Sequence, residues 1–307
     1  MKKTLISIVG PTAIGKTALS IKLAKHYNTE IISADSRQFF KEMSIGTAAP
    51  TPTELAAAKH HFIHHKSIED AYNVGTFEKD AIQLLDQLFK TQDLVVMVGG
   101  SGLYVDAVIN GLDNFPEIDS KIRESLNLQL EVEGLEVLQK KLEVLDPESF
   151  KNITIENPKR VIRALEICIG SGQPYSSFLN KDKNQRAFKT INLGLTAERD
   201  VMYSRINQRV DIMMQNGLLE EVIPLQNKQN LNALNTVGYK ELFKYLKGEW
   251  PLDFAISEIK KNSRRFAKRQ LTWFRKKENH LWFDYKTPLE TIIETINTTL
   301  EESAINE

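Results

Sequence analysis

Cysteine, net charge and long apolar runs are scarce in this 307-residue sequence. The single cysteine, Cys168, excludes a disulfide framework and any zinc site built from several cysteines, and its apolar surroundings predict an inert core thiol. No apolar run reaches the roughly 18 residues of a membrane-spanning helix, and the first one, 5–9, is too short for a signal-peptide core. We therefore expect a cytoplasmic protein with no membrane association.

The charges of the sequence cancel, because 40 lysines and arginines face 40 aspartates and glutamates. Net charge therefore says nothing about function. The distribution is uneven, however: residues 260–277 carry nine basic residues and no acidic one, whereas 284–307 carry six acidic residues and one lysine. A basic patch on a neutral protein indicates a local site for a polyanion.

The first third of the sequence alternates between strand and helix patterns. Apolar runs predict strands at 5–9, 30–33 and 94–98, with a further short strand possible within 59–64. Helices are expected at 16–26 and, capped by Thr76, over the apolar positions from Phe77 to Leu88. Strands that are apolar throughout are typical of a parallel sheet covered on both faces, so this alternation predicts a doubly wound α/β sheet.

The alternation stops after residue 110. Residues 118–170 read as helices, with a start at Asn157-Pro158, and a strand returns at 188–195. Further helices are expected near 198–215, 218–226, 238–247 and 253–279. At about 150 residues per domain, the length allows two domains or one domain with an insertion. We predict an α/β phosphate-loop core with a parallel sheet and C-terminal helices (1–112 and 188–307), interrupted by a helical insertion (113–187).

The motif GPTAIGKT (10–17) matches the phosphate-binding pattern G-x-x-x-x-G-K-[ST] and lies between a strand and a helix, as that pattern requires. Its glycines let backbone N–H groups turn toward an anion, and the helix N-terminus and the lysine add positive charge. The threonine offers its hydroxyl to Mg²⁺. The predicted phosphate-binding residues are Gly10, Pro11, Thr12, Ala13, Ile14, Gly15, Lys16 and Thr17.

The apparatus of nucleotide hydrolysis is not evident beside this loop. Such enzymes place a carboxylate for Mg²⁺ at the end of a neighbouring apolar strand, but the strand at 94–98 runs into Gly99-Gly-Ser-Gly102. The nearest carboxylate at a strand end is Asp35, in the polar cluster Asp35-Ser36-Arg37-Gln38. Ligands of open α/β sheets bind at this edge, so Asp35 could be a general base, a metal ligand or only the N-cap of a helix.

Several motifs together resemble the bacterial tRNA dimethylallyltransferases. They are GPTAIGKT (10–17), ADSRQ (34–38), IGTAAP (45–50), GGSGLYVDAVINGL (99–112), NPKRVIRALEI (157–167), YSRINQRVDIMMQNGLLEEV (203–222), VGYKEL (237–242) and RRFAKRQLTWFR (264–275). The resemblance extends over residues 5–284. Two positions depart from the family pattern: Ser101 stands where threonine is usual, and Lys159 where glutamine is usual.

The resemblance implies that N6 of adenine 37 in tRNA attacks C1 of dimethylallyl diphosphate and expels diphosphate. It assigns catalysis to Asp35, as acceptor of the N6 proton, and to Ser101, as a positioning hydroxyl. Lys16, Thr17, Mg²⁺ and Arg205 would then neutralise the diphosphate. A stacked adenine cannot be reached, so the base must be flipped out of the anticodon stem-loop.

The resemblance also implies a set of tRNA contacts, although basic residues on a helix are commonly no more than a solvated face. In the segment 260–277, helical spacing places Lys261, Arg265, Lys268, Thr272, Arg275 and Lys276 on one face, for phosphates, and Ile259, Phe266, Trp273 and Phe274 on the opposite face, for the core. The expected tRNA-binding residues are Asp35, Ser36, Arg37, Gln38, Ser101, Arg123, Lys159, Arg160, Val161, Ile162, Arg163, Arg265, Lys268 and Arg275.

Two other functions fit parts of the sequence. The phosphate loop alone permits a small-molecule kinase that binds ATP, and a prenyltransferase acting on free adenine nucleotides would share the same chemistry. The histidines His60, His61, His64 and His65 suggest a metal, but no cysteine lies near them, so we expect them to border the core and predict no zinc site. The enzyme is expected to be a monomer.

Overall fold

The computed structural model describes residues 3–179 and 185–305. Its chain forms two compact units. The first, here the core unit, consists of Met1–Ile109 and Arg186–Glu307, and the second, here the helical unit, is Asn110–Gln185. Each unit is described by itself.

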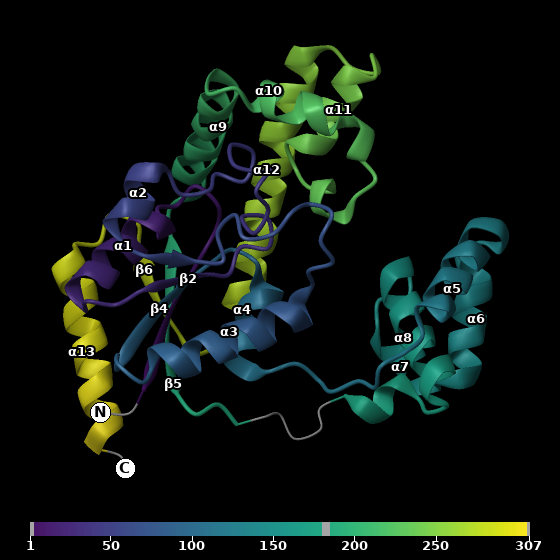
Figure 1. The fold of residues 1–307 in the computed structure, drawn as a ribbon, viewed down its shortest axis with the longest axis horizontal. Helices are drawn as coiled ribbons and strands as arrows, with labels where there is room; N and C mark the ends of the chain where they lie inside the picture. Colours follow the sequence, from purple (N-terminus) through teal and green to yellow (C-terminus); the bar gives the residue numbers. More distant parts are fainter. Residues whose placement is uncertain (1–2, 180–184, 306–307) are drawn as a thin grey trace. The chain divides into compact units, whose positions relative to one another are not determined.

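A six-stranded parallel sheet forms the centre of the core unit, which confirms the predicted α/β class (Figure 1). The strand order is β3-β2-β4-β1-β5-β6. Ile8 of β1 lies beside Val98 of β4 and Leu193 of β5, so these strands end at the same edge. The strands are β1 (Thr4–Val9), β2 (Ile31–Ser33), β3 (His60–His61), β4 (Leu94–Val98), β5 (Lys189–Thr196) and β6 (His280–Asp284).

Apolar side chains cover both faces of this sheet. Leu5 and Val9 of β1 belong to the cluster that contains α3 (Val74–Leu88) and α4 (Gly102–Asn110). Ile6 and Ile8 belong instead to the cluster that contains α1 (Lys16–His26) and α13 (Leu289–Ile305). Successive residues of a strand point to opposite faces, and the continuously apolar strands of the sequence are therefore buried on both sides.

Two local features differ from the prediction. Helix α3 begins at Val74, and its cap is Asn73, whose side chain accepts hydrogen bonds from the N–H groups of Gly75 and Thr76. Asn73 is as good a cap as Thr76, and the tertiary fold uses the earlier position. The predicted long helix near 253–279 ends at Arg275, because the aromatic segment 280–284 forms the edge strand β6.

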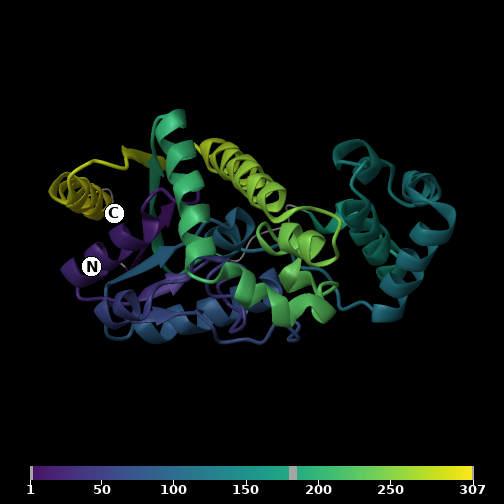
Figure 2. The ribbon, with the colours of Figure 1, turned by 90° about the horizontal axis from the view of Figure 1, so that it is seen from above.

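The remaining helices of the core unit extend beyond the carboxyl ends of the strands (Figures 1 and 2). Helix α12 packs against α9 and α11, and its buried residues include Ala267, Leu271 and Phe274. These elements are α2 (Pro52–Ala57), α9 (Arg199–Gln215), α10 (Leu218–Val222), the 3₁₀ helices η2 (Ile223–Lys228) and η3 (Asn232–Leu234), α11 (Tyr239–Leu246) and α12 (Leu252–Arg275).

The helical unit has its own apolar core. It consists of α5 (Ser120–Glu133), α6 (Leu135–Leu145), α7 (Pro147–Asn152), α8 (Pro158–Ser171) and the 3₁₀ helix η1 (Tyr175–Phe178). Helix α8 starts with Asn157 as its cap and Pro158 in its first turn, as the sequence predicts. Cys168 is a buried free thiol in this core. Among the described residues, no helix has the length and apolar character of a membrane span.

Candidate active site

The phosphate loop joins β1 to α1, and its two glycines explain its path. Gly10 has a φ of 143°, and a Cβ there would lie 2.6 Å from the carbonyl oxygen of Leu195 on β5. Gly15 has a φ of 110° and caps α1 in the left-handed conformation. Only glycine adopts both conformations without strain. The loop is therefore pressed against the sheet, with Lys16 at the first position of the helix.

Lys16 is a cation whose charged form is disfavoured. Its Nζ donates to the carbonyl oxygen of Pro11 at 2.7 Å. Burial, together with the nearby Arg209 guanidinium, lowers the pKa of Lys16 to about 7, although the carboxylate of Asp35 acts in the opposite direction. Because an anion would favour the charged form, the site is suited to a ligand that brings negative charge.

Two arginines on α9 approach the loop from the side of that helix. Arg205 donates through Nε to the carbonyl oxygen of Ala13 at 2.9 Å, and Arg209 donates through Nη1 to Thr12 Oγ1 at 3.0 Å. The two residues are four positions apart and therefore lie on one face of the helix. Arg205 was expected here; Arg209 was not, although the spacing of the two arginines is a signal that could have revealed it.

The polar cluster after β2 forms a tight turn. The Oδ1 atom of Asp35 accepts a hydrogen bond from the N–H of Arg37 at 3.0 Å, so Asp35 caps a turn rather than a helix. Its Oδ2 atom has no hydrogen-bond partner among the described residues. Gln38 donates to the carbonyl oxygens of Thr47 and Ala48 and so holds the loop after residue 43. The capping role thus accounts for one carboxylate oxygen and not for the other.

Three glycines in the segment Gly99–Gly102 each lie against a different neighbour. A Cβ on Gly99 would lie 2.4 Å from the carbonyl oxygen of Ala34, and one on Gly102 would lie 2.4 Å from the ring of Trp273. Between them, Ser101 Oγ accepts from the N–H of Ser36 at 3.0 Å and donates to Ser36 Oγ at 3.1 Å. Ser101 therefore connects this loop to the cluster that contains Asp35, as the shared sheet edge predicted.

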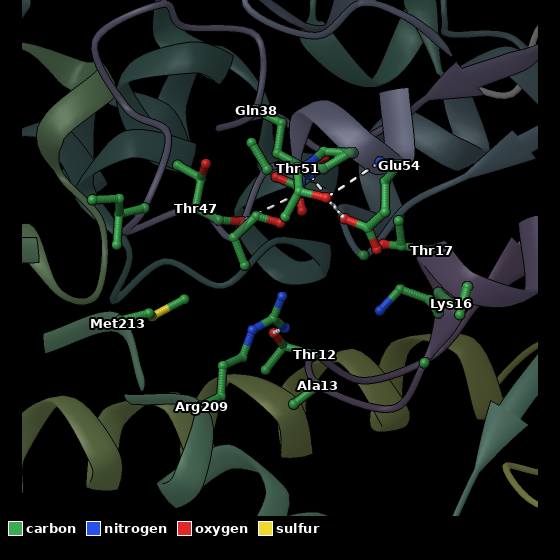
Figure 3. A pocket seen from close by; sticks show the side chains of 18 of the residues that line it. Thr12, Ala13, Lys16, Thr17, Gln38, Thr47, Thr51, Glu54, Arg209 and Met213 are labelled. Carbon is green, nitrogen blue, oxygen red and sulfur yellow. Dashed lines mark hydrogen bonds between the residues drawn. The ribbon is translucent and has the colours of Figure 1, made fainter. Parts of the chain in front are cut away.

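Two pockets open on these motifs and share part of their walls. The first, of about 640 Å³, contains the phosphate loop, and the second, of about 490 Å³, contains Ser101 and part of α12. Lys16 and Arg209 direct their cationic ends into the first pocket (Figure 3). The residues that line both pockets are Thr12, Asp35, Thr47, Ala48, Gly100, Arg209 and Met213. Asp35 thus lies where the two pockets meet.

The aromatic residues of α12 correct the sequence analysis. Phe274 is buried as expected, but Trp273 and Phe266 are 41% and 40% exposed and line the second pocket. Trp273 Nε1 donates to Asp106 Oδ2 at 2.9 Å. A simple two-sided division of the helix failed here because this side of α12 faces a cavity rather than packed core.

A second group of residues that sequence reasoning missed fixes the loop after residue 43. The carboxylate of Glu221 accepts from the backbone N–H groups of Ser44, Ile45 and Gly46 at 2.9, 2.6 and 2.9 Å. The hydroxyl of Tyr239 donates to Glu221 Oε1 at 2.6 Å, and burial together with this carboxylate raises the pKa of Tyr239. Through this loop Thr47 and Ala48 form part of both pockets.

In the helical unit, two of the arginines assigned to tRNA are held by one acid. Arg123 donates twice to the buried Glu166, at 3.0 and 2.6 Å, and Arg163 donates to Glu166 Oε2 at 2.9 Å. Arg160 donates to Thr154 Oγ1. The two arginines hold the pKa of Glu166 below its usual value against the effect of burial.

Burial also corrects the motif in α8. The side chains of Val161 and Ile162 are 0% and 5% exposed and belong to the core of the helical unit. The helix directs these two side chains inward, so we do not retain them as side-chain contacts to tRNA. Lys159 and Arg160 are exposed, and Arg163 is partly exposed.

The basic face of α12 lies on the surface. Arg265 and Lys268 are exposed, as are Arg269, Thr272 and Lys276. Arg275 is exposed too, and its guanidinium lies over the ring of Trp282 and 3.4 Å from Thr196 Oγ1.

The histidines are spread over the segment that runs from β3 to Lys66. His61 Nε2 lies 2.5 Å from Glu30 Oε2, whereas His65 packs edge-on against Phe39, Phe62 and Tyr72, where burial lowers its pKa to about 4. In the described parts of the chain, no three histidine, cysteine or acidic side chains converge to hold a metal ion.

The first pocket nevertheless suits Mg²⁺ bound with a diphosphate. Mg²⁺ takes oxygen ligands, often one carboxylate and the oxygens of a phosphate group. Thr17, with its hydroxyl, and Glu54, with its carboxylate, both line this pocket. They are the residues that would hold the ion.

A phosphate loop that shares an aspartate with a second pocket is the arrangement expected of a group-transfer enzyme of the phosphate-loop class. Residues 38–277 match the family model described as IPP transferase. The chain belongs to this family.

The similarity to known proteins extends over the whole chain. It is 60% identical over 306 residues to the tRNA dimethylallyltransferase of Christiangramia forsetii, and 57% identical over 307 residues to that of Flavobacterium johnsoniae; each match covers at least 98% of both chains. The crystal structure of the tRNA isopentenylpyrophosphate transferase of Bacillus halodurans has a TM-score of 0.73 and 39% identity, and covers 99% of this chain and 98% of its own.

A eukaryotic dimethylallyltransferase acting on tRNA has a TM-score of 0.77 and 26% identity, over 92% of this chain and 74% of its own.

Proposed function

We propose that this enzyme transfers a dimethylallyl group from dimethylallyl diphosphate to N6 of adenine 37 in tRNA and releases diphosphate. The observation that carries the proposal is the junction of the two pockets at Asp35. A transfer reaction needs two sites that meet at one point, one for the diphosphate and one for the acceptor. A hydrolase would need only the first.

The first pocket would bind the diphosphate. Lys16, Arg205 and Arg209 lie around the phosphate loop, and their charges would stabilise the negative charge that develops as the C1–O bond breaks. Mg²⁺, held by Thr17 and Glu54, would supply a further positive charge to the leaving group. No activated water is required, which agrees with the lack of a carboxylate after β4.

The second pocket would bind the adenine. The exposed rings of Trp273 and Phe266 offer faces on which a flipped base can stack. As N6 forms its bond to C1, it must lose one proton, and the unpartnered Oδ2 of Asp35 is the acceptor at the junction. Ser101 would orient Asp35 through its hydrogen bonds to Ser36.

The rest of the tRNA would contact basic residues on both units. Arg265, Lys268 and Arg275 would bind phosphates, which gives affinity without sequence information. In the helical unit we retain Arg123, Lys159, Arg160 and Arg163. We take the chain to act as a monomer, because the residues of one chain form both pockets. The proposed tRNA substrate is consistent with a cytoplasmic enzyme.

Labelled dimethylallyl diphosphate distinguishes the three candidate functions. We expect label in an undermodified tRNA stem-loop, none in the same stem-loop with guanine at position 37, and none in AMP. Label in AMP would favour a prenyltransferase of free nucleotides. Phosphate transfer from ATP to a small molecule, without prenyl transfer, would favour a kinase.

A further inference from the structure

One buried amide bridges the phosphate loop and the loop that carries Ser101. Gln270 of α12 is only 6% exposed. Its Oε1 accepts a hydrogen bond from the N–H of Thr12 at 2.9 Å, and its Nε2 donates to the carbonyl oxygen of Gly100 at 2.9 Å. A primary amide is the side-chain group that serves a backbone donor and a backbone acceptor together. The chemistry of the two partners also fixes which end of the amide faces which loop.

The packing of α12 does not require a buried glutamine at this position. Ala267, Leu271 and Phe274 already bury the neighbouring face of α12, and a buried amide costs free energy unless both of its ends are satisfied. The fit is also tight, because a Cβ on Gly100 would lie 2.3 Å from Gln270 Nε2. The contact therefore serves the loops more than the helix.

The bridge spans the junction of the two pockets. Thr12 and Gly100 each line both pockets, and Gln270 lines the second. Gly100 immediately precedes Ser101, which in turn contacts the turn of Asp35. A change in the separation of Thr12 and Gly100 would therefore move the diphosphate site relative to the proton acceptor.

We propose that Gln270 is a positioning residue for prenyl transfer, which fixes the distance between the phosphate loop and the Gly99–Gly102 loop at the junction of the two pockets. The proposal rests on the function proposed above. It also implies that the N–H of Thr12 is engaged by protein, so that the diphosphate is bound by the later amides of the loop.

Gln270→Glu tests this role through its protonation. A carboxylate can accept from Thr12 but cannot donate to Gly100, whereas a protonated carboxyl has one donor and one acceptor and restores both hydrogen bonds. Burial raises the pKa of such a carboxyl, whereas the ammonium of Lys16, which like Gln270 lies against Gly100, lowers it, so kcat is measured over the whole pH range in which the protein stays folded. We expect kcat to fall by about 10–100-fold at the upper end, since small misplacements of reacting groups cost about this much.

The decisive result is recovery. The kcat of Gln270→Glu, divided by that of the parent at the same pH, should rise as the pH falls, while KM for tRNA changes by less than about threefold. Gln270→Met, which keeps the length but lacks both hydrogen-bonding atoms, should be slow at every pH. Gln83→Glu, on the exposed face of α3, adds the same charge and should match the parent.

Two outcomes would overturn the proposal. Parent-like kcat in Gln270→Glu and Gln270→Met would show that the bridge does not matter. Equal losses in both variants without recovery at low pH, together with a lower Tm, would assign Gln270 a structural role. A parent enzyme that transfers no prenyl group to tRNA would instead overturn the proposed function and this inference with it.

Discussion

The cations around the phosphate loop and two arginines of the helical unit are held in place by different partners. Lys16, Arg205 and Arg209 donate to a carbonyl oxygen or a hydroxyl, and none of them forms an ion pair with a described carboxylate. Arg123 and Arg163, by contrast, share the carboxylate of the buried Glu166.

The two arrangements differ in how much of the positive charge remains available to a ligand. A neutral acceptor orients a cation and leaves its charge for a ligand, whereas a carboxylate orients it and neutralises much of the charge. The first arrangement suits an anion site with high charge density, such as that for a diphosphate. The second stabilises a helical unit and leaves part of its charge for weaker contacts.

The largest effect is expected at Asp35, beside the unpaired cations. Asp35→Asn keeps the oxygen that caps the turn but removes the proton acceptor, so kcat should fall by about 10²–10⁴-fold. Single-turnover kinetics with a tRNA stem-loop measure the change, and the binding of the stem-loop should remain within about twofold. Normal turnover would show that Asp35 only caps the turn and is not the proton acceptor.

The salt dependence of tRNA binding tests whether the exposed basic residues of α12 contribute more to tRNA affinity than the arginines paired with Glu166. Replacing Arg265, Lys268 and Arg275 together with glutamine should lower the magnitude of the slope of log K against log salt by about 2–3 units. Arg123→Gln should change this slope less and should also lower stability, because it breaks two hydrogen bonds to Glu166. Titrations with a tRNA stem-loop at several salt concentrations measure these slopes. Equal slopes for the parent and the triple variant would show that α12 does not bind tRNA phosphates.

The ion pairs of the helical unit can be removed by replacing their shared acid, Glu166. Glu166→Gln leaves Arg123 and Arg163 without their shared carboxylate and should reduce the free energy of unfolding by about 1–3 kcal/mol, a range that allows for the partial exposure of both arginines. Thermal unfolding compares it with Glu143→Gln, on the exposed side of α6. An equal Tm for the two variants would contradict the anchoring role of Glu166.

The unpaired state of Lys16 predicts a dependence on pH. Because its pKa is lowered to about 7 in the free protein and an anion must raise it, binding of diphosphate takes up a proton. Affinity should therefore fall as the pH rises above 7, by up to about tenfold per pH unit from this group. Calorimetry in buffers of different ionisation enthalpy measures the uptake, which Lys16→Arg should abolish, since arginine stays charged.

The smallest effect is expected for the stability of the Trp273→Ala variant. The sequence suggested a buried tryptophan worth about 3–5 kcal/mol, but a ring that is 41% exposed should cost no more than about 2 kcal/mol. Phe274→Ala, its buried neighbour, should show the larger loss. Trp273→Ala should act mainly on KM for tRNA. If Trp273→Ala destabilises the protein as much as Phe274→Ala, the ring belongs to the core after all.

Local sequence predicted the elements and motifs that depend on short-range physics. The parallel strands at 5–9 and 94–98 follow from apolar runs, and the start of α8 from Asn157-Pro158. The phosphate loop follows from two glycines in their required conformations. The short strand β6 and the cap of α3 were missed, because several adjacent segments satisfied the local rules and tertiary packing chose among them.

Tertiary structure alone decided which polar groups meet. Gln270 lies 258 residues from Thr12, and Glu221 lies 177 residues from Ser44, so no local pattern indicates either contact. The same holds for the arginines: the sequence places Arg123 and Arg205 on helices, but their hydrogen-bond partners come from distant elements. The sequence by itself determined the class of fold and the phosphate site. Packing determined which cations keep their charge for a ligand, because the free energy of a charge depends on the groups that folding brings beside it.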